Sequence, residues 1–134
     1  MLRTAVEAAA GDAGLHHALG LVLTRLKRSD DAIAEFHRAA DLDTDRARYT
    51  YVYAVALHSL GRGAEAITVL EQGLAKHPQD RDILLALITF NRDAGYLDAA
   101  LEYAQRMAGL TPGDREIADL VETLQTLVRK SHGQ

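Results

Sequence analysis

The chain of 134 residues has 48% hydrophobic and 25% charged residues, which predicts a globular domain with its own core rather than a disordered chain. It contains no cysteine, which excludes disulfide frameworks, zinc ribbons, thiol nucleophiles and attached haems. A net charge of −4 and a pI near 5.8 argue against broad electrostatic binding to nucleic acid or to anionic lipid, so neither is expected as a partner.

The beginning of the chain does not read as an export signal, because Glu7 falls where a signal peptide needs an apolar run. The longest weakly charged stretch, residues 49–60, is too short to predict a membrane span. The localisation therefore stays unknown, with the cytoplasm as the default expectation and the periplasm as the alternative if the chain comes from an exported parent protein.

A period of 34 residues runs through the chain. Pro78 and Pro112 are separated by this distance, and so are Gly61 and Gly95. Three alanines recur at the same spacing, and each precedes a branched aliphatic residue: Ala32 with Ile33, Ala66 with Ile67, and Ala100 with Leu101. So many linked positions predict a repeat architecture.

Each period contains two apolar runs with steps of three and four residues, separated by a short polar or glycine-rich break. This pattern predicts a helix, a tight turn and a second helix, whose apolar stripes face each other. In the first period the two runs are Leu15, Leu19, Val22, Leu23 and Leu26, then Ala32, Ile33, Phe36, Ala39 and Ala40.

Residues that start and stop helices stand at the expected places. Aspartates precede three of the predicted helices and are expected to cap them: Asp12, Asp80 and Asp114. The pair Asp30-Asp31 is likewise expected to cap a helix. Gly61 and Gly95 are expected to end first helices with a positive φ.

A helix–turn–helix unit of 34 residues resembles the tetratricopeptide repeat. The residues that carry this resemblance are His16, Leu19, Gly20, Ala32, Phe36 and Ala39 in the first unit, Tyr53, Ala54, Leu57, Gly61, Ala66, Leu70, Gly73 and Pro78 in the second, and Leu84, Leu87, Gly95, Ala100 and Pro112 in the third. The resemblance implies an all-α fold, a right-handed solenoid of antiparallel helix pairs. It places the repeats at 13–46, 47–80 and 81–114, after a partial repeat at 1–12 and before a capping helix at 115–131 and a tail at 132–134.

The third unit departs from the other two at a pair of positions. Ile88 stands where the earlier units have Gly20 and Ala54, and Ala104 stands where they have Phe36 and Leu70. We interpret this as an exchange of volume across the helix pair.

No arrangement of residues predicts catalysis: motifs for metalloproteases, serine hydrolases and phosphate-binding loops are all missing from the sequence. We therefore expect no enzyme activity and no cofactor. His17 and His58 fall on first helices, but the sequence offers no further ligand beside them, so no metal site is expected. His16 is expected to be partly buried, and His37 and His77 to be solvated.

The resemblance implies that the first helices line a concave, ligand-binding groove. Transferred position by position, the groove residues are His17, Leu21, Thr24 and Arg25, then Arg48, Tyr51, Val55, His58 and Ser59, then Asp82, Leu85, Thr89, Arg92 and Asp93. Tyr51 is the expected aromatic anchor for a peptide, whereas Tyr49 and Tyr53 are expected in the core. The Lys and Asn with which some members bind a terminal carboxylate are absent, so the Hsp70 or Hsp90 tail is not an expected ligand.

Three hypotheses for function follow. The first is a non-catalytic scaffold that binds a partner peptide in the groove. The second is a structural role, in self-association or in docking to a larger protein through an apolar surface at Leu2, Ala5 and Val6. The third rests on residues 47–58, which resemble repeat modules appended to bacterial multihaem cytochromes and suggest an exported electron-transfer parent. The abundance of Ala and Arg suggests a bacterial source.

Overall fold

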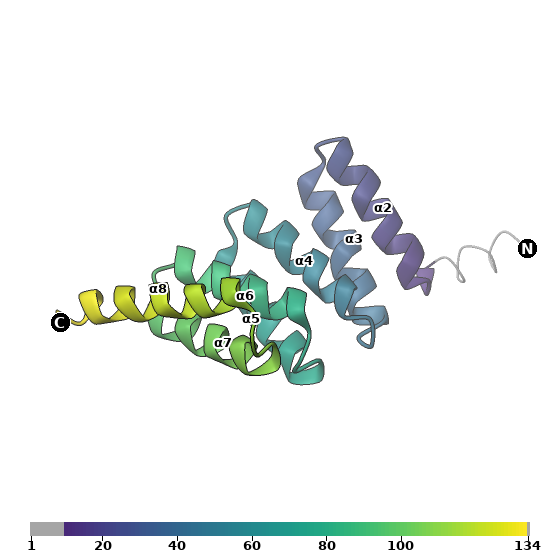
Figure 1. Cartoon of the computed structure of the whole chain (residues 1–134). Helices are drawn as coiled ribbons and strands as arrows, with labels where there is room; N and C mark the ends of the chain where they lie inside the picture. Colours follow the sequence, from purple (N-terminus) through teal and green to yellow (C-terminus); the bar gives the residue numbers. More distant parts are fainter. Residues whose placement is uncertain (1–9, 134) are drawn as a thin grey trace, which may run out of the picture. The chain divides into compact units, whose positions relative to one another are not determined.

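The structure, a computed structural model, describes residues 10–133, and within them all regular structure is helical (Figure 1). The seven helices are α2 (Ala13–Arg25), α3 (Ser29–Leu42), α4 (Ala47–Ser59), α5 (Gly63–Lys76), α6 (Arg81–Asp93), α7 (Leu97–Leu110) and α8 (Arg115–Ser131). The chain divides into two compact units, Met1–Val69 and Leu70–Gln134, with the division inside α5. Of the described helices, none is long and apolar enough to cross a membrane.

In the first unit, α3 packs against both α2 and α4. Its apolar face enters the core because the residues recur every three or four positions, so that all of them point to one side of the helix. Tyr49 and Tyr53 are buried, as predicted, with 8% and 9% of their surface exposed. The buried residues of this unit are Leu23, Ala32, Ile33, Phe36, Ala39, Ala40, Tyr49, Tyr53, Ala54, Leu57, Ala66 and Ile67.

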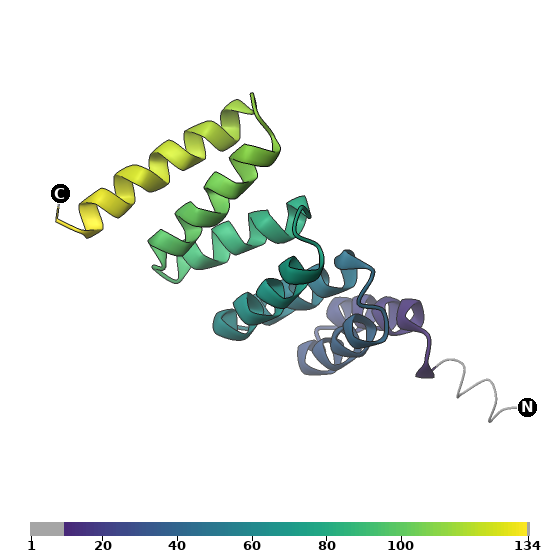
Figure 2. The same cartoon turned by 90° about the horizontal axis from the view of Figure 1, so that it is seen from below.

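In the second unit, α7 packs against α6 on one side and α8 on the other (Figure 2). The core contains one polar side chain, Asn91, whose Nδ2 donates a hydrogen bond of 2.7 Å to the Leu87 carbonyl. The buried apolar residues are Leu70, Leu74, Ile83, Leu84, Ala86, Leu87, Ile88, Phe90, Ala100, Ala104, Met107, Ile117 and Leu124.

The helix starts confirm three predicted caps. The carboxylates of Asp12, Asp80 and Asp114 accept backbone hydrogen bonds of 3.1, 2.9 and 3.3 Å from the third residue after each. Each bond satisfies one of the N–H groups that the first helical turn leaves without a backbone acceptor.

The predicted cap at Asp30 and Asp31 is wrong. Helix α3 begins one residue earlier, at Ser29, so Arg28 takes the cap position and makes no side-chain cap bond. The two aspartates stand in the first turn, where the positive end of the helix dipole favours them. Asp31 also accepts a hydrogen bond of 3.0 Å from Arg28 Nε.

The first helix of each repeat is followed by a residue with a left-handed backbone conformation. Gly61 and Gly95 have φ of +77° and +85°, as predicted. One period earlier the same place is taken by Lys27, with φ of +60°. A residue with a Cβ is strained in this conformation, which glycine adopts freely.

The prediction that the apolar stripes of the two helices in a pair face each other is wrong for α2. Leu15, Leu19, Val22 and Leu26, which we call the α2 stripe, are 53%, 46%, 49% and 62% exposed. Helix α2 instead meets α3 through a different face, which contains Gly20 and His16. A Cβ on Gly20 would lie 2.5 Å from the Phe36 ring, and His16 is hydrogen-bonded to Glu35. Leu23 alone of the predicted first run is buried.

Helix α8 ends at Ser131, where the predicted capping helix ends. Its apolar residues are covered to different degrees: Ile117 and Leu124 are buried, whereas Leu127 is 36% exposed. Residues 1–9 of the predicted partial repeat, with the apolar residues Leu2, Ala5 and Val6, lie outside the described residues, as does Gln134.

Candidate functional site

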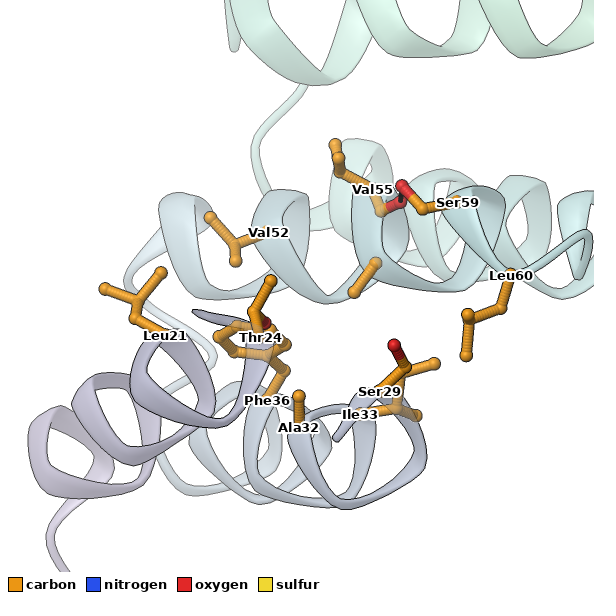
Figure 3. Close-up of a pocket in the computed structure, with 11 residues that line it drawn as sticks. Leu21, Thr24, Ser29, Ala32, Ile33, Phe36, Val52, Val55, Ser59 and Leu60 are labelled. Atoms are coloured by element: carbon orange, nitrogen blue, oxygen red, sulfur yellow. Dashed lines mark hydrogen bonds between the residues drawn. The ribbon is translucent and has the colours of Figure 1, made fainter. Parts of the chain in front are cut away.

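An apolar pocket of about 210 Å³ opens between α2, α3 and α4 in the first unit (Figure 3). An apolar cavity of about 150 Å³ can hold benzene, so this volume suits one Leu, Ile, Met or Phe side chain. The lining residues are Leu21, Thr24, Ser29, Ala32, Ile33, Phe36, Val52, Val55, Ala56, Ser59 and Leu60.

The hydroxyl groups add little polarity to this pocket. Thr24 Oγ1 donates a 2.9 Å bond to the Gly20 carbonyl, and Ser59 Oγ donates a 2.9 Å bond to the Val55 carbonyl. Because each hydroxyl hydrogen is used within its own helix, these side chains do not demand a donor or acceptor from a ligand. The pocket is therefore suited to an apolar group.

The pocket depends on how closely α2 and α3 approach each other. Gly20 has no side chain, so the Phe36 ring lies against the α2 backbone. The ring is 3% exposed and forms part of the wall, while Ala32 and Ala56 contribute only methyl groups. A close helix contact beside small residues thus leaves space next to it that no side chain of the described residues fills.

Several predicted groove residues of the first unit meet at this pocket. Leu21, Thr24, Val55 and Ser59 line it, two from α2 and two from α4. The predicted cations are exposed on the same two helices, Arg25 on α2 and Arg48 on α4. The other two α4 residues, Tyr51 and His58, are half-buried and do not line the pocket.

His17, also predicted in the groove, is half-buried among aromatic rings. Its ring centroid lies 4.9 Å from that of Tyr49 and 5.7 Å from that of Phe36. Its Nδ1 is buried without a hydrogen-bond partner. Burial, together with the positive charge of Arg48, lowers the pKa of His17 below its ordinary value of 6.5. The structure therefore gives His17 the surroundings of a neutral packing residue.

His16 has the opposite electrostatic environment. Its Nδ1 lies 2.5 Å from Glu35 Oε2 and its Nε2 lies 2.8 Å from the Ala10 carbonyl oxygen. Both contacts suit a ring that carries two protons, and the hydrogen bond to Glu35 is the main cause that raises the pKa of His16 above 6.5. His16 is half-buried, as predicted.

Two outer histidines differ from each other. The ring of His37 is exposed and stacks on Tyr53, with 4.8 Å between centroids. His77, predicted to be solvated, is half-buried directly after α5, where its backbone N–H donates to the Gly73 carbonyl.

In the second compact unit, Leu70–Gln134, the predicted groove residues lie on α6 and belong to the third predicted repeat. Leu85 and Thr89 are half-buried, and Asp82, Arg92 and Asp93 are exposed. The Arg92 Nε lies 3.7 Å from a carboxylate oxygen of Asp93, so the two charges partly offset each other. Within residues 10–133, no group of three His, Asp or Glu side chains could hold a metal ion.

The sequence did not lead us to predict the residues of α3, the second helix of its pair, that line the pocket. Ile33, Phe36 and Ala32 come from α3, which the groove prediction left out because it considered first helices only. A signal was present in Ala32 and Ala56, two small residues on helices that flank the pocket, but their effect depends on the distance between helices.

Comparisons with known proteins agree with this architecture. Residues 47–90 match the sequence profile of the tetratricopeptide repeat. A crystal structure of MamA superposes with a TM-score of 0.75 at 19% identity, over 98% of this chain and 74% of that chain. The first tetratricopeptide domain of Spaghetti (RPAP3), bound to the HSP90 peptide SRMEEVD, superposes with a TM-score of 0.71 at 16% identity, over 87% and 94% of the two chains. The Sgt2 domain from Aspergillus fumigatus gives 0.73 at 16% identity, over 91% and 82%.

These similarities define first the class of fold, an all-α solenoid of helix pairs. More particularly, the chain has the tetratricopeptide-repeat fold, and its seven described helices are consistent with three repeats and a capping helix. Folds of this type are generally non-catalytic interaction modules. None of the curated proteins compared matches the chain in sequence.

Proposed function

We propose that the chain is a non-catalytic scaffold that binds a peptide segment of a partner protein, with one large apolar side chain of that peptide in the pocket of the first unit. The observation that carries the proposal is the coincidence of the pocket with predicted groove positions: Leu21, Thr24 and Val55 line it. A domain of the same fold in RPAP3 binds a peptide, which supports this mode of use.

The charges around the pocket favour an acidic peptide. Arg25 and Arg48 are exposed on the two helices that border it, so acidic residues beside the apolar anchor would add electrostatic attraction. The Lys and Asn of a carboxylate-binding site are absent, with Leu21 and Val55 at two of those positions. The ligand we propose is therefore an internal apolar–acidic segment and not a chaperone C-terminus.

The test is selection from a random ten-residue peptide library displayed on phage, followed by titration of a selected synthetic peptide. We expect enriched peptides to share one large apolar residue. Leu21→Asp places a charge at the rim of the pocket and should weaken binding at least about tenfold, within the range of a lost anchor contact. Leu110→Asp, on the comparably exposed Leu110 of α7, should change the Kd less than about twofold.

No enrichment of apolar peptides, or equal Kd values for the wild type and Leu21→Asp, would refute the pocket as the binding site. Tyr51→Ala tests the aromatic anchor separately. We expect this change to weaken the same peptide by about 1–3 kcal/mol, while circular dichroism shows the helices unchanged. An unchanged Kd would remove Tyr51 from the groove without affecting the argument for the pocket.

A further inference from the structure

The pocket of the first unit is larger than one aliphatic side chain or one aromatic ring needs. A cavity of about 150 Å³ holds benzene, which has six carbon atoms. At the same ratio, the volume of about 210 Å³ holds about eight or nine non-hydrogen atoms. The Leu side chain has four such atoms and the Phe side chain seven, so both fit the pocket without filling it. The two fused rings of Trp have nine.

The pocket is also elongated. Its wall on α4 runs from Val52 to Ser59, two helical turns and about 10 Å along the helix. Figure 3 shows Leu21 and Val52 toward one end of the pocket, and Ser29 and Leu60 toward the other. The volume spread over this length gives a mean cross-section of about 20 Å². Such a long and narrow space suits a flat two-ring group better than a compact branched one.

The polar side-chain atoms of the pocket are hydroxyl oxygens. Thr24, Ser29 and Ser59 supply them, and among the described residues that line the pocket no side chain carries a nitrogen or a carboxylate. Thr24 and Ser59 use their hydrogens within their own helices, so toward a ligand their oxygens act as acceptors. The indole of Trp has one N–H donor and no acceptor, which matches this lining.

The charges beside the pocket favour the same side chain. Arg25 and Arg48 are exposed on the two helices that border it. A guanidinium attracts the face of an aromatic ring, and it attracts Trp more strongly than Tyr or Phe.

We propose that the anchor of the partner peptide is a Trp, with its rings along the pocket between α2 and α4 and its N–H directed at the hydroxyl oxygens. This inference rests on the proposed function, because it names the residue by which the peptide is held. Two aliphatic side chains from successive turns of a peptide helix are the other occupant that the volume admits, and the experiments below separate the two.

Selection from the peptide library, run in parallel on the wild type and on Leu21→Asp, provides the first test. Peptides that depend on the pocket should be enriched in Trp over Leu and Phe in the wild-type selection only. Enrichment of Leu, Ile or Met without Trp would overturn the Trp anchor and leave the proposed function standing. No enrichment of any apolar residue would overturn both.

A peptide series then separates ring size from hydrogen bonding. One selected sequence is synthesised with Trp, with Leu, or with naphthylalanine, which keeps two rings but has no N–H. Relative to the Trp peptide, we expect the Kd to rise at least about tenfold with Leu and about threefold to tenfold with naphthylalanine. Equal Kd values for Trp and Leu would overturn the Trp anchor, and an equal Kd for naphthylalanine would overturn its hydrogen bond.

Fluorescence reports whether the Trp is buried. The protein has no Trp, so the peptide supplies the only indole in the complex. Its emission should shift to shorter wavelength on binding, because the indole leaves water. An unshifted emission at saturating protein would overturn the proposal.

A smaller pocket should discriminate against the larger anchor. Ala56 is half-buried on α4 and lines the pocket, so Ala56→Val reduces its volume. The Kd of the Trp peptide should rise at least about fivefold, and that of the Leu peptide less than about twofold. Ala118→Val, at an exposed position of α8, is the matched control and should change neither value. Equal changes for the two peptides would place the Trp outside the pocket.

Discussion

Replacing Gly20 with alanine should destabilise the protein, although Gly20 lies inside a helix. A Cβ at this position would stand 2.5 Å from Cε1 and 2.6 Å from Cδ1 of Phe36. Carbon atoms in contact prefer separations of about 3.5–4.0 Å, so the ring would have to move by about 1 Å. Phe36 has little freedom to move, since it is 3% exposed and contacts the His17 ring.

Two effects of opposite sign set the magnitude. Alanine stabilises a helix by about 0.5–1 kcal/mol relative to glycine, whereas overpacking of a core costs about 1–3 kcal/mol. The net effect of Gly20→Ala is therefore a loss of up to about 2.5 kcal/mol, measured from urea denaturation followed by circular dichroism. Gly109→Ala is the matched control, because nothing lies within 4 Å of a Cβ there. It should stabilise the protein, or at least not destabilise it.

A stabilised Gly20→Ala variant would refute the close contact between α2 and α3. The double variant Gly20→Ala with Phe36→Leu makes the test sharper, because the second repeat has Ala54 and Leu70 at the same two positions. The smaller side chain should accommodate the added methyl group. The double variant is then more stable than the sum of the two single changes predicts, by at least about 0.5 kcal/mol.

Further predictions concern single positions. Lys27→Gly should stabilise the protein by about 0.5–1 kcal/mol in urea denaturation, because it relieves a left-handed backbone; a loss of stability would contradict this. Asp80→Ala should cost about 1 kcal/mol through the lost cap, whereas Asp82→Ala, a neighbouring exposed aspartate, should cost less. Because the pKa of His17 is lowered in the folded protein, the wild type loses stability as the pH falls from 6.5 through that pKa. The stability of His17→Phe relative to the wild type should therefore be greater at pH 5 than at pH 7.5. The raised pKa of His16 has the opposite sign: its stabilisation is complete below pH 6.5 and is lost as pH rises through the raised pKa, so His16→Gln should cost more at pH 6 than at pH 9. Denaturation midpoints that do not depend on pH in this way would contradict both assignments.

The helical architecture could be predicted because it depends on local patterns. The period of 34 residues locates the units, and Asp12, Asp80 and Asp114 mark helix starts by a hydrogen bond within a single turn. Lys27 was harder to predict, since nothing in its side chain favours a positive φ. Its conformation follows from the need of α2 to end where Gly61 and Gly95 end the later first helices.

The binding surface could be predicted only in part, because a pocket depends on distances between helices as well as on which residues face it. The resemblance to the tetratricopeptide repeat placed Leu21, Thr24 and Val55 on the groove side, and all three line the pocket. Periodicity also assigned the α2 stripe to the contact with α3, whereas the chain makes that contact through Gly20. In a helix with apolar residues on more than one side, the smallest residue decides which side comes closest to its neighbour. Gly20 thus determines both where the Phe36 wall of the pocket stands and which apolar face of α2 is exposed among the described residues.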